Sequence, residues 1–115
     1  MAKPTRVLLH LGPGRRQALD PADVFFLEAQ ADNTLIRMRR ARRVEDVRSL
    51  GTLEAVFRPF GFVRISREAM VNPEHVHQVR QRGRSGEWEL KLRPPVNRVL
   101  PVGRSFLAKL WAAFG

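Results

Sequence analysis

Short segments of strand length, each ended by a turn signal, run through most of this sequence and constrain its fold more than any other feature. Residues 6–11 favour a β-strand and end at Gly12-Pro13-Gly14, which must turn. Val24 to Glu28 is a short apolar run, and residues 34–40 alternate between apolar side chains and arginine, which is typical of a strand with one face on a core. Further strands are predicted over residues 44–47, 62–65, 76–82, 88–93 and 98–102.

Two segments have helical spacing instead. Ser49 is a plausible N-cap, four apolar residues follow at helical intervals, and Pro59-Phe60-Gly61 ends the element. Residues 105–114 carry an apolar stripe in which we expect Trp111 and Phe114 to pack in the core. Between residue 65 and Met70 the pattern predicts a short turn or helical coil. The chain is therefore expected to be mainly β with two short helices, and periodicity alone does not distinguish a sandwich from a barrel.

Length and composition bound the remaining possibilities. At 115 residues the chain is expected to form a single domain, residues 1–115, with its core at about 7–114. The absence of cysteine excludes disulfides, thiolate catalysis and cysteine-based zinc sites. No apolar run of membrane-spanning length and no signal peptide is present, so we expect a soluble cytoplasmic protein without a membrane partner.

The charge balance indicates a polyanionic partner. The formal net charge is +10, and 18 of the 21 basic residues are arginine. A guanidinium group suits bidentate recognition of phosphate and of guanine edges better than a lysine ammonium does. Coding bias explains part of this preference for arginine over lysine, but it does not explain the excess of positive charge.

The sequence contains no recognisable set of catalytic residues. His75 and His77 lie two residues apart on a predicted strand, but there is no third ligand nearby, so we expect surface or turn histidines and not a metal site. The acidic residues offer no general acid and base pair, and no glycine-rich phosphate loop joins a strand to a helix. An enzyme is not expected, and neither is a cofactor.

Three segments carry the functional signal. Residues 62–72 read Phe-Val-Arg-Ile-Ser-Arg-Glu-Ala-Met-Val-Asn, with two arginines between apolar residues. Residues 100–105 read Leu-Pro-Val-Gly-Arg-Ser, and residues 23–33 run from Asp23 through an aromatic strand to Asn33. In type, order and spacing these segments resemble the LytTR-type DNA-binding domain of bacterial transcription regulators, from about Val7 to Phe114. The resemblance implies an elongated antiparallel β-sandwich whose loops and helix foot enter successive major grooves.

The resemblance also assigns candidate base-reading residues. They are Asn33, Ser66, Arg67 and Arg104. Arg104 precedes a predicted helix, where it could hold a phosphate or point at a base, or alternatively pair with Glu87 or Glu89. Asn33 is suited to pairing with adenine, although an ordinary β-turn would use the same residue type.

A second group of residues is expected to contact phosphates and so to provide affinity without sequence preference. The candidates are Arg37, Arg39, Arg40, Arg42, Arg43, Arg64 and Ser105. A weaker basic patch is formed by Arg80, Arg82 and Arg84. The alternative for Arg64 is that its stem packs across the sheet.

The sequence also departs from the family pattern. Ser66 replaces the usual histidine, Glu68 stands where a small hydroxyl residue is expected, and Thr34 stands where tyrosine is common. A carboxylate near phosphates lowers affinity unless it pairs with an arginine or accepts a hydrogen bond from a cytosine amino group.

The family implies double-stranded DNA with paired repeats as the partner, a homodimer on that DNA, and a separate input or sensor protein. The sequence leaves two alternative hypotheses. The chain is either an RNA-binding basic β domain or a LytTR-like interaction module that has lost DNA binding.

Overall fold

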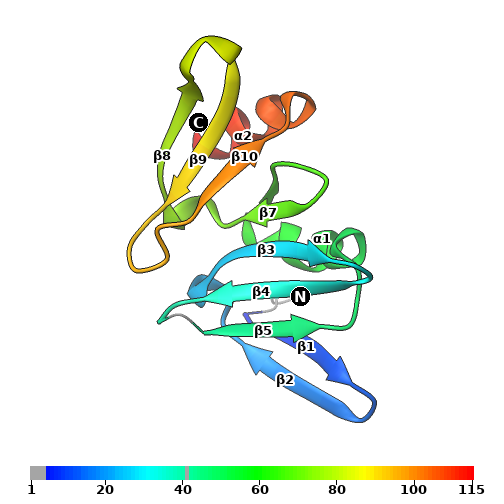
Figure 1. Cartoon of the computed structure of the whole chain (residues 1–115). Coiled ribbons are helices and arrows are strands. Elements are labelled where there is room, and N and C mark those ends of the chain that lie inside the picture. Colours follow the sequence, from blue (N-terminus) through cyan, green and yellow to red (C-terminus); the bar gives the residue numbers. More distant parts are fainter. Residues whose placement is uncertain (1–4, 41) are drawn as a thin grey trace.

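The computed structural model describes residues 5–40 and 42–115, which form an elongated body of 49 × 33 × 26 Å (Figure 1). Its strands are β1 (Val7–Gly12), β2 (Arg15–Leu19), β3 (Val24–Gln30), β4 (Asn33–Met38), β5 (Arg43–Asp46), β6 (Val63–Arg64), β7 (Ala69–Val71), β8 (Val76–Arg82), β9 (Glu87–Leu92) and β10 (Val99–Val102). Its α-helices are α1 (Leu50–Phe57) and α2 (Leu107–Phe114). All strand pairs are antiparallel, so the predicted mainly β fold with two short helices is confirmed.

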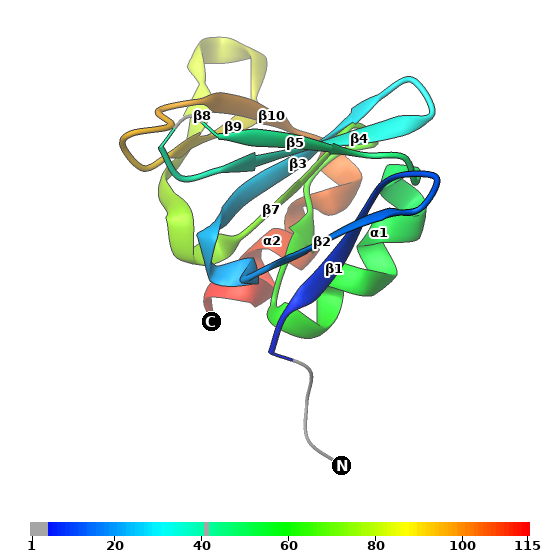
Figure 2. The same ribbon diagram turned by 90° about the horizontal axis from the view of Figure 1, so that it is seen from below.

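The described strands form three sheets. The largest has the order β5-β4-β3-β7-β6, a second has the order β10-β9-β8, and β1 and β2 form a two-stranded ribbon. Viewed from below, the ribbon and α1 lie on one side of the β3–β5 strands, and the β8–β10 sheet lies beyond the other side (Figure 2). The large sheet therefore separates two packed layers.

Two hydrophobic cores result from this arrangement, and β3 contributes to both. Leu27 packs with residues of α1 and of β1, whereas Phe26 packs with residues of β9, β10 and α2. β7 is divided in the same way, because Met70 belongs to the first core and Val71 to the second. Successive side chains of a strand point to opposite faces, so one buried strand can serve both layers.

Helix α1 begins and ends as its sequence predicts. The Ser49 Oγ accepts a hydrogen bond from the Thr52 N–H at 3.2 Å, which caps the helix. A 3-10 turn over Arg58–Phe60 follows, and Gly61 ends it with a φ of 89°, in the left-handed region that glycine adopts most easily. This compact ending directs the chain into β6.

Two strands were not expected from the pattern. β2 pairs with β1, but only Leu19 of its five residues is buried, so it has no apolar run to mark it. β7 occupies part of the stretch predicted as turn or coil, and all three of its residues are buried because it pairs with both β3 and β6. Pairing on both sides favours a strand even for three residues, which is too short a segment for a periodicity signal.

Other expectations are corrected at the level of side chains. Trp111 and Phe114 are exposed on α2 and not in the core, although Trp111 packs edge-on against Trp88 with ring centroids 5.0 Å apart. His75 is buried rather than on the surface, stacked on Phe25 at 4.1 Å. The strand expected over residues 34–40 ends at Met38, and the turn predicted around residue 41 lies partly outside the described residues.

None of the helices in residues 5–40 and 42–115 has the length and apolar character needed to cross a membrane.

Candidate nucleic-acid interface

Three connecting segments lie along one side of the molecule, on the right in Figure 1. They are residues 31–33, which turn from β3 into the first residue of β4, residues 66–68 between β6 and β7, and residues 103–105 after β10; we call them the three-loop edge. The Ala29 N–H donates to the Glu68 carbonyl at 2.8 Å, and the Gly103 N–H donates to the Ile65 carbonyl at 2.7 Å. Backbone hydrogen bonds therefore fix the central segment to both of its neighbours.

Arg64 binds the main chain of the central segment of this edge. Its Nε donates to the Ser66 carbonyl at 2.7 Å, and its Nη2 donates to the Arg67 carbonyl at 2.6 Å. Its Nη1 donates to Glu54 Oε1 on α1 at 2.8 Å. The guanidinium thus binds three protein acceptors and sets the path of the loop.

The carboxylate of Glu54 joins two arginines. Glu54 Oε2 accepts from Arg58 Nη2 at 2.7 Å, while Oε1 accepts from Arg64. The hydrogen bond from Arg58, together with that from Arg64, lowers the pKa of Glu54 below its ordinary value despite its partial burial. The carboxylate consequently stays ionised and keeps Arg64 in place.

The residues at the tip of the central segment differ in exposure. Ser66 is buried, and its Oγ accepts a hydrogen bond from the Glu68 N–H at 3.1 Å. Arg67 and Glu68 are exposed. Within the part of the chain that the structure describes, neither side chain forms an ion pair. The loop therefore presents one free guanidinium and one free carboxylate.

Arg104 occupies the third segment of the edge. It is exposed and begins the 3-10 turn Arg104–Phe106 that leads into α2, with the exposed Ser105 next to it. A methyl group on Gly103 would lie 3.0 Å from Phe106 Cδ2, so this turn is tight. Arg104 forms no ion pair among the described residues: Glu89 pairs with Arg80 at 2.8 Å, and Glu87 pairs with no arginine there.

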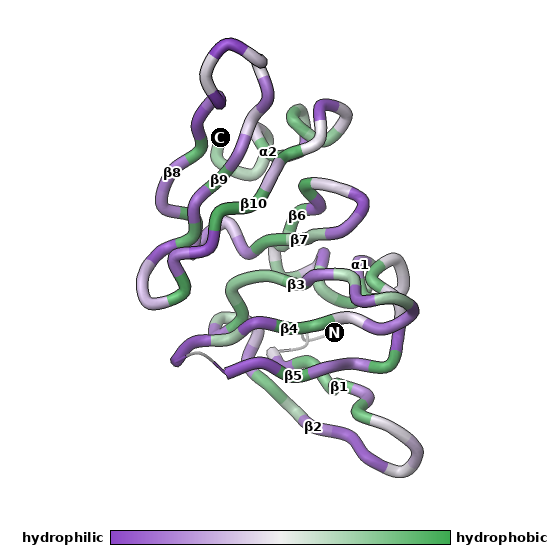
Figure 3. The backbone as a smooth tube through the Cα atoms, viewed as in Figure 1, coloured by the Kyte–Doolittle hydropathy of each residue, from purple (hydrophilic) through white to green (hydrophobic). Residues whose placement is uncertain are grey.

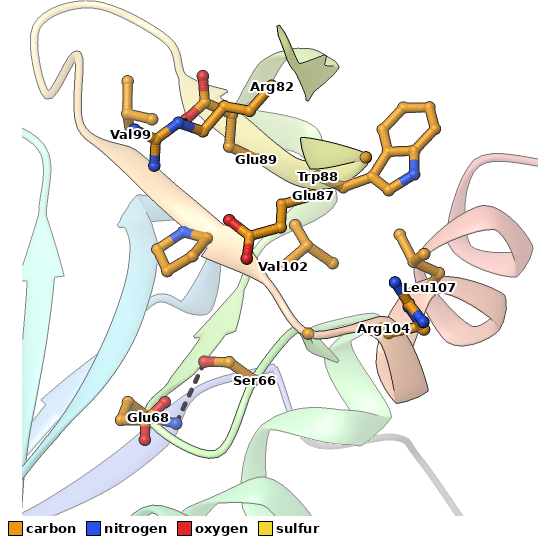
Figure 4. A pocket seen from close by; sticks show the side chains of 13 residues that line it. Ser66, Glu68, Arg82, Glu87, Trp88, Glu89, Val99, Val102, Arg104 and Leu107 are labelled. Atoms are coloured by element: carbon orange, nitrogen blue, oxygen red, sulfur yellow. Dashed lines mark hydrogen bonds and ion pairs between the residues drawn. The ribbon is translucent and has the colours of Figure 1, made fainter. Parts of the chain in front are cut away.

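A groove of about 620 Å³ separates the central segment from the third (Figure 4). Glu68 and Ser66 line one wall, Arg104 lies at the other, and Glu87 extends into the space between them. Pro101 and other apolar residues of β10 contribute to its lining. The carboxylates of Glu68 and Glu87 and the guanidinium of Arg104 thus line the same groove.

Asn33 lies in the first segment of the edge, and its side-chain amino group already forms a hydrogen bond within the protein. Its Nδ2 donates to Glu45 Oε1 at 2.9 Å, which leaves the amide oxygen as an acceptor. The neighbouring Thr34 is buried, and its Oγ1 donates to the Arg48 carbonyl at 2.8 Å. The threonine in this position is therefore part of the packed structure and not of the exposed edge.

Four of the predicted phosphate-binding arginines lie at the opposite end of the molecule. These are Arg39, Arg40, Arg42 and Arg43, where β4 gives way to β5, and we call them the arginine end (Figures 1 and 3). The Arg39 N–H donates to the Asp23 carbonyl at 3.1 Å, just before β3 begins. The seven residues of β3 separate this end from the three-loop edge, a distance of about 20 Å.

Arg37 lies on β4 between the two groups, on the same face of the sheet as Phe26. It is directly opposite Arg43 on β5 and Phe26 on β3. Its Nε is the one buried side-chain polar atom in residues 5–40 and 42–115 that has no hydrogen-bond partner. The two like charges opposite each other, and not the buried Nε, are what would favour the approach of an anion.

Three residues shape this edge without a role assigned to them from the sequence, except for Glu87 as an alternative partner of Arg104. Glu54 anchors Arg64, Gly103 brings the third segment close to the second, and Glu87 enters the groove. The i and i+4 spacing of Glu54 and Arg58 on the predicted helix is a signal that could have found their ion pair, whereas no local pattern indicates that Arg64 joins it.

Comparisons with known proteins agree with the fold. The family model of the LytTr DNA-binding domain matches residues 14–115. Among solved structures, the chain is similar to the LytTr DNA-binding domain of a methyl-accepting/DNA response regulator from Bacillus cereus, with a TM-score of 0.76 and 19% identity. That similarity covers 98% of this chain and 99% of the other. No match was found among curated proteins.

Proposed function

This chain belongs to the LytTr DNA-binding domain family, and we propose that it reads a specific double-stranded DNA site with its three-loop edge. One observation carries this proposal. Arg67 and Arg104 are exposed and unpaired among the described residues, and the Ile65–Gly103 hydrogen bond of 2.7 Å holds their two segments together. A fixed pair of free guanidinium groups is suited to the O6 and N7 atoms of guanine in the major groove.

The base-reading residues have unequal roles in this proposal. Arg67 and Arg104 contact base edges directly, and Asn33 adds an acceptor through its free amide oxygen. Ser66 acts through its neighbour, because its hydroxyl accepts the Glu68 N–H and its side chain is buried.

Phosphate contacts are proposed at two places. Ser105 is exposed beside Arg104 and would bind a phosphate at the edge itself. The arginine end, together with Arg37, would bind phosphates about 20 Å away, which corresponds to roughly six base pairs of duplex. Arg64 contributes by positioning the loop, since its guanidinium is occupied by protein acceptors.

We propose paired repeats as the DNA target, with one protomer on each repeat, and a separate input or sensor protein that governs binding in the cytoplasm. Binding of two protomers to adjacent repeats would give each protomer a higher effective concentration for the second site.

The test is recovery of bound genomic fragments, followed by titration of the recovered duplex, a scrambled duplex, an RNA duplex, single-stranded RNA and single-stranded DNA. We expect the recovered duplex to bind most tightly. Its affinity should fall by about 10³ to 10⁵ between 50 and 200 mM salt if roughly six to ten phosphates are contacted. Equal affinity for the recovered and the scrambled duplex would contradict sequence-specific reading.

The titrations with RNA test the alternative function of RNA binding. Trp111 and Phe114 are exposed on α2, and exposed aromatic side chains are the stacking surface that single-stranded RNA recognition uses. Tighter binding to RNA than to any DNA would favour that function. No binding to any nucleic acid at low salt would favour an interaction module.

A further inference from the structure

Glu68 is the unusual residue of the three-loop edge. Its N–H donates to Ser66 Oγ at 3.1 Å, and its carbonyl accepts from the Ala29 N–H at 2.8 Å. The main chain is thus fixed on both sides, while the side chain is exposed. The position of this carboxylate at the loop tip is set by the fold and does not depend on a partner for the side chain itself.

The chain offers many arginines, yet Glu68 pairs with none of them in residues 5–40 and 42–115. Five acidic residues do form ion pairs with arginine, namely Asp23, Glu28, Asp46, Glu54 and Glu89. Arg64, four residues before Glu68, is directed to Glu54 and to the carbonyls of the loop. The carboxylate is therefore left available on a surface that is proposed to face a polyanion.

An unpaired carboxylate beside phosphates is repelled unless it finds a hydrogen-bond donor. In the major groove the donors are the amino groups of cytosine and adenine. Adenine also presents its N7 acceptor next to its amino group, which opposes a group that can only accept. Cytosine presents no such acceptor on that edge, so it is the better partner for Glu68.

Resting on the proposed DNA-binding function, we propose that Glu68 is a specificity-determining residue that accepts a hydrogen bond from the N4 amino group of a cytosine. Arg67 is its neighbour in sequence and is suited to guanine. The two residues would therefore read a cytosine and a guanine close together in the same site. Ser66 is a positioning residue in this arrangement, because its hydroxyl fixes the Glu68 main chain.

The experiment selects binding sites from a randomised duplex library with the wild-type chain and three variants. E68A removes the acceptor, and E68Q replaces the carboxylate by an amide, which pairs with adenine through one acceptor and one donor. E74A is the charge-matched control, because Glu74 is also exposed and unpaired among the described residues but lies in the Pro73–His75 turn, where β8 begins. Circular dichroism confirms that each variant is folded.

The wild-type chain and E74A are expected to select a cytosine at one position by about 10-fold over the other bases. E68A should lose that preference while keeping the guanine read by Arg67, and E68Q should move it towards adenine. If E68A selects the same site as the wild type, and only binds all duplexes more tightly, Glu68 merely repels phosphates and this inference is wrong. A wild-type chain that selects no site would overturn the proposed function, and this inference with it.

Discussion

Arg64 Nη1 lies 2.8 Å from Glu54 Oε1, and this ion pair joins α1 to the loop that carries Arg67. Both side chains are largely buried, at 16% and 19% exposure, so water screens the pair less than it screens a surface ion pair. The other donors of Arg64 bind main-chain carbonyls of the loop. The loop is therefore supported by a side chain of α1.

This support predicts that Glu54 affects DNA binding. We expect E54Q to weaken binding to the selected duplex by about 10-fold, because the loop loses a fixed anchor. The slope of affinity against salt should stay unchanged, since no phosphate contact is removed. Fluorescence anisotropy titrations at several salt concentrations measure both quantities.

R64A should behave in the same way as E54Q if Arg64 positions the loop. A direct phosphate contact by Arg64 predicts the opposite pattern, in which R64A lowers the salt slope by about 1 and E54Q does not weaken binding. Measuring the two variants together separates these roles.

Arg67 and Arg104 are expected to carry sequence preference. R67A and R104A should each weaken binding to the selected duplex by about 5- to 150-fold, equivalent to about 1–3 kcal/mol, with little change for a scrambled duplex. R15A is the matched control for the loss of one positive charge, because Arg15 is exposed at the start of β2 and belongs to none of the three segments of the edge. Competition titrations give the ratio of the two affinities, and an unchanged ratio in both variants would remove these residues from base reading.

The arginine end is expected to act through charge alone. Replacing Arg40 and Arg42 together by alanine should weaken binding to selected and scrambled duplexes equally, and should lower the salt slope by about 2. A change in which site is selected from a random library would show instead that this end reads bases.

Asp46 predicts a pH-dependent contribution to stability. Burial alone would raise its pKa, but hydrogen bonds from the Arg48 side chain and from the His10 and Arg48 N–H groups outweigh burial and lower the pKa below 3.8. A carboxyl group with a lowered pKa in the folded state stabilises that state above its unfolded pKa, and this contribution is lost as pH falls through the folded value.

D46N should therefore lower the free energy of unfolding by about 3 kcal/mol at neutral pH, because it leaves the half-buried Arg48 without its partner. Urea denaturation at a series of pH values gives the difference between wild type and variant. That difference should be constant above about pH 5 and shrink progressively as pH falls through 3.8 and below. A difference that already declines near pH 6 would assign the effect to another group.

The sequence predicted most elements whose residues alternate clearly or carry a cap. Ser49 and Gly61 mark the two ends of the α1 region, and the alternation of Ile36 and Met38 with arginine placed β4. β7 was missed because its three residues are all buried, so they show no alternation. Trp111 was misplaced because a stripe on a short helix shows which residues share a face but not how much of that face the neighbouring sheet covers.

The sequence predicted which residues belong to the candidate site, but not which of them lie close together. Arg67 and Arg104, about forty positions apart in the sequence, lie on adjacent segments because of one hydrogen bond between Ile65 and Gly103. The sequence also did not show that the length of β3 separates the arginine end from these two residues. Such separations depend on strand pairing, which a local pattern does not specify.

β3 and β7 each place side chains in both hydrophobic cores, and this sharing has a consequence for how the molecule unfolds. If either core opens, the strands that form one wall of the other lose their packing as well. The loops of the three-loop edge and the arginines at the opposite end should therefore melt together, in one cooperative transition whose calorimetric and van't Hoff enthalpies agree.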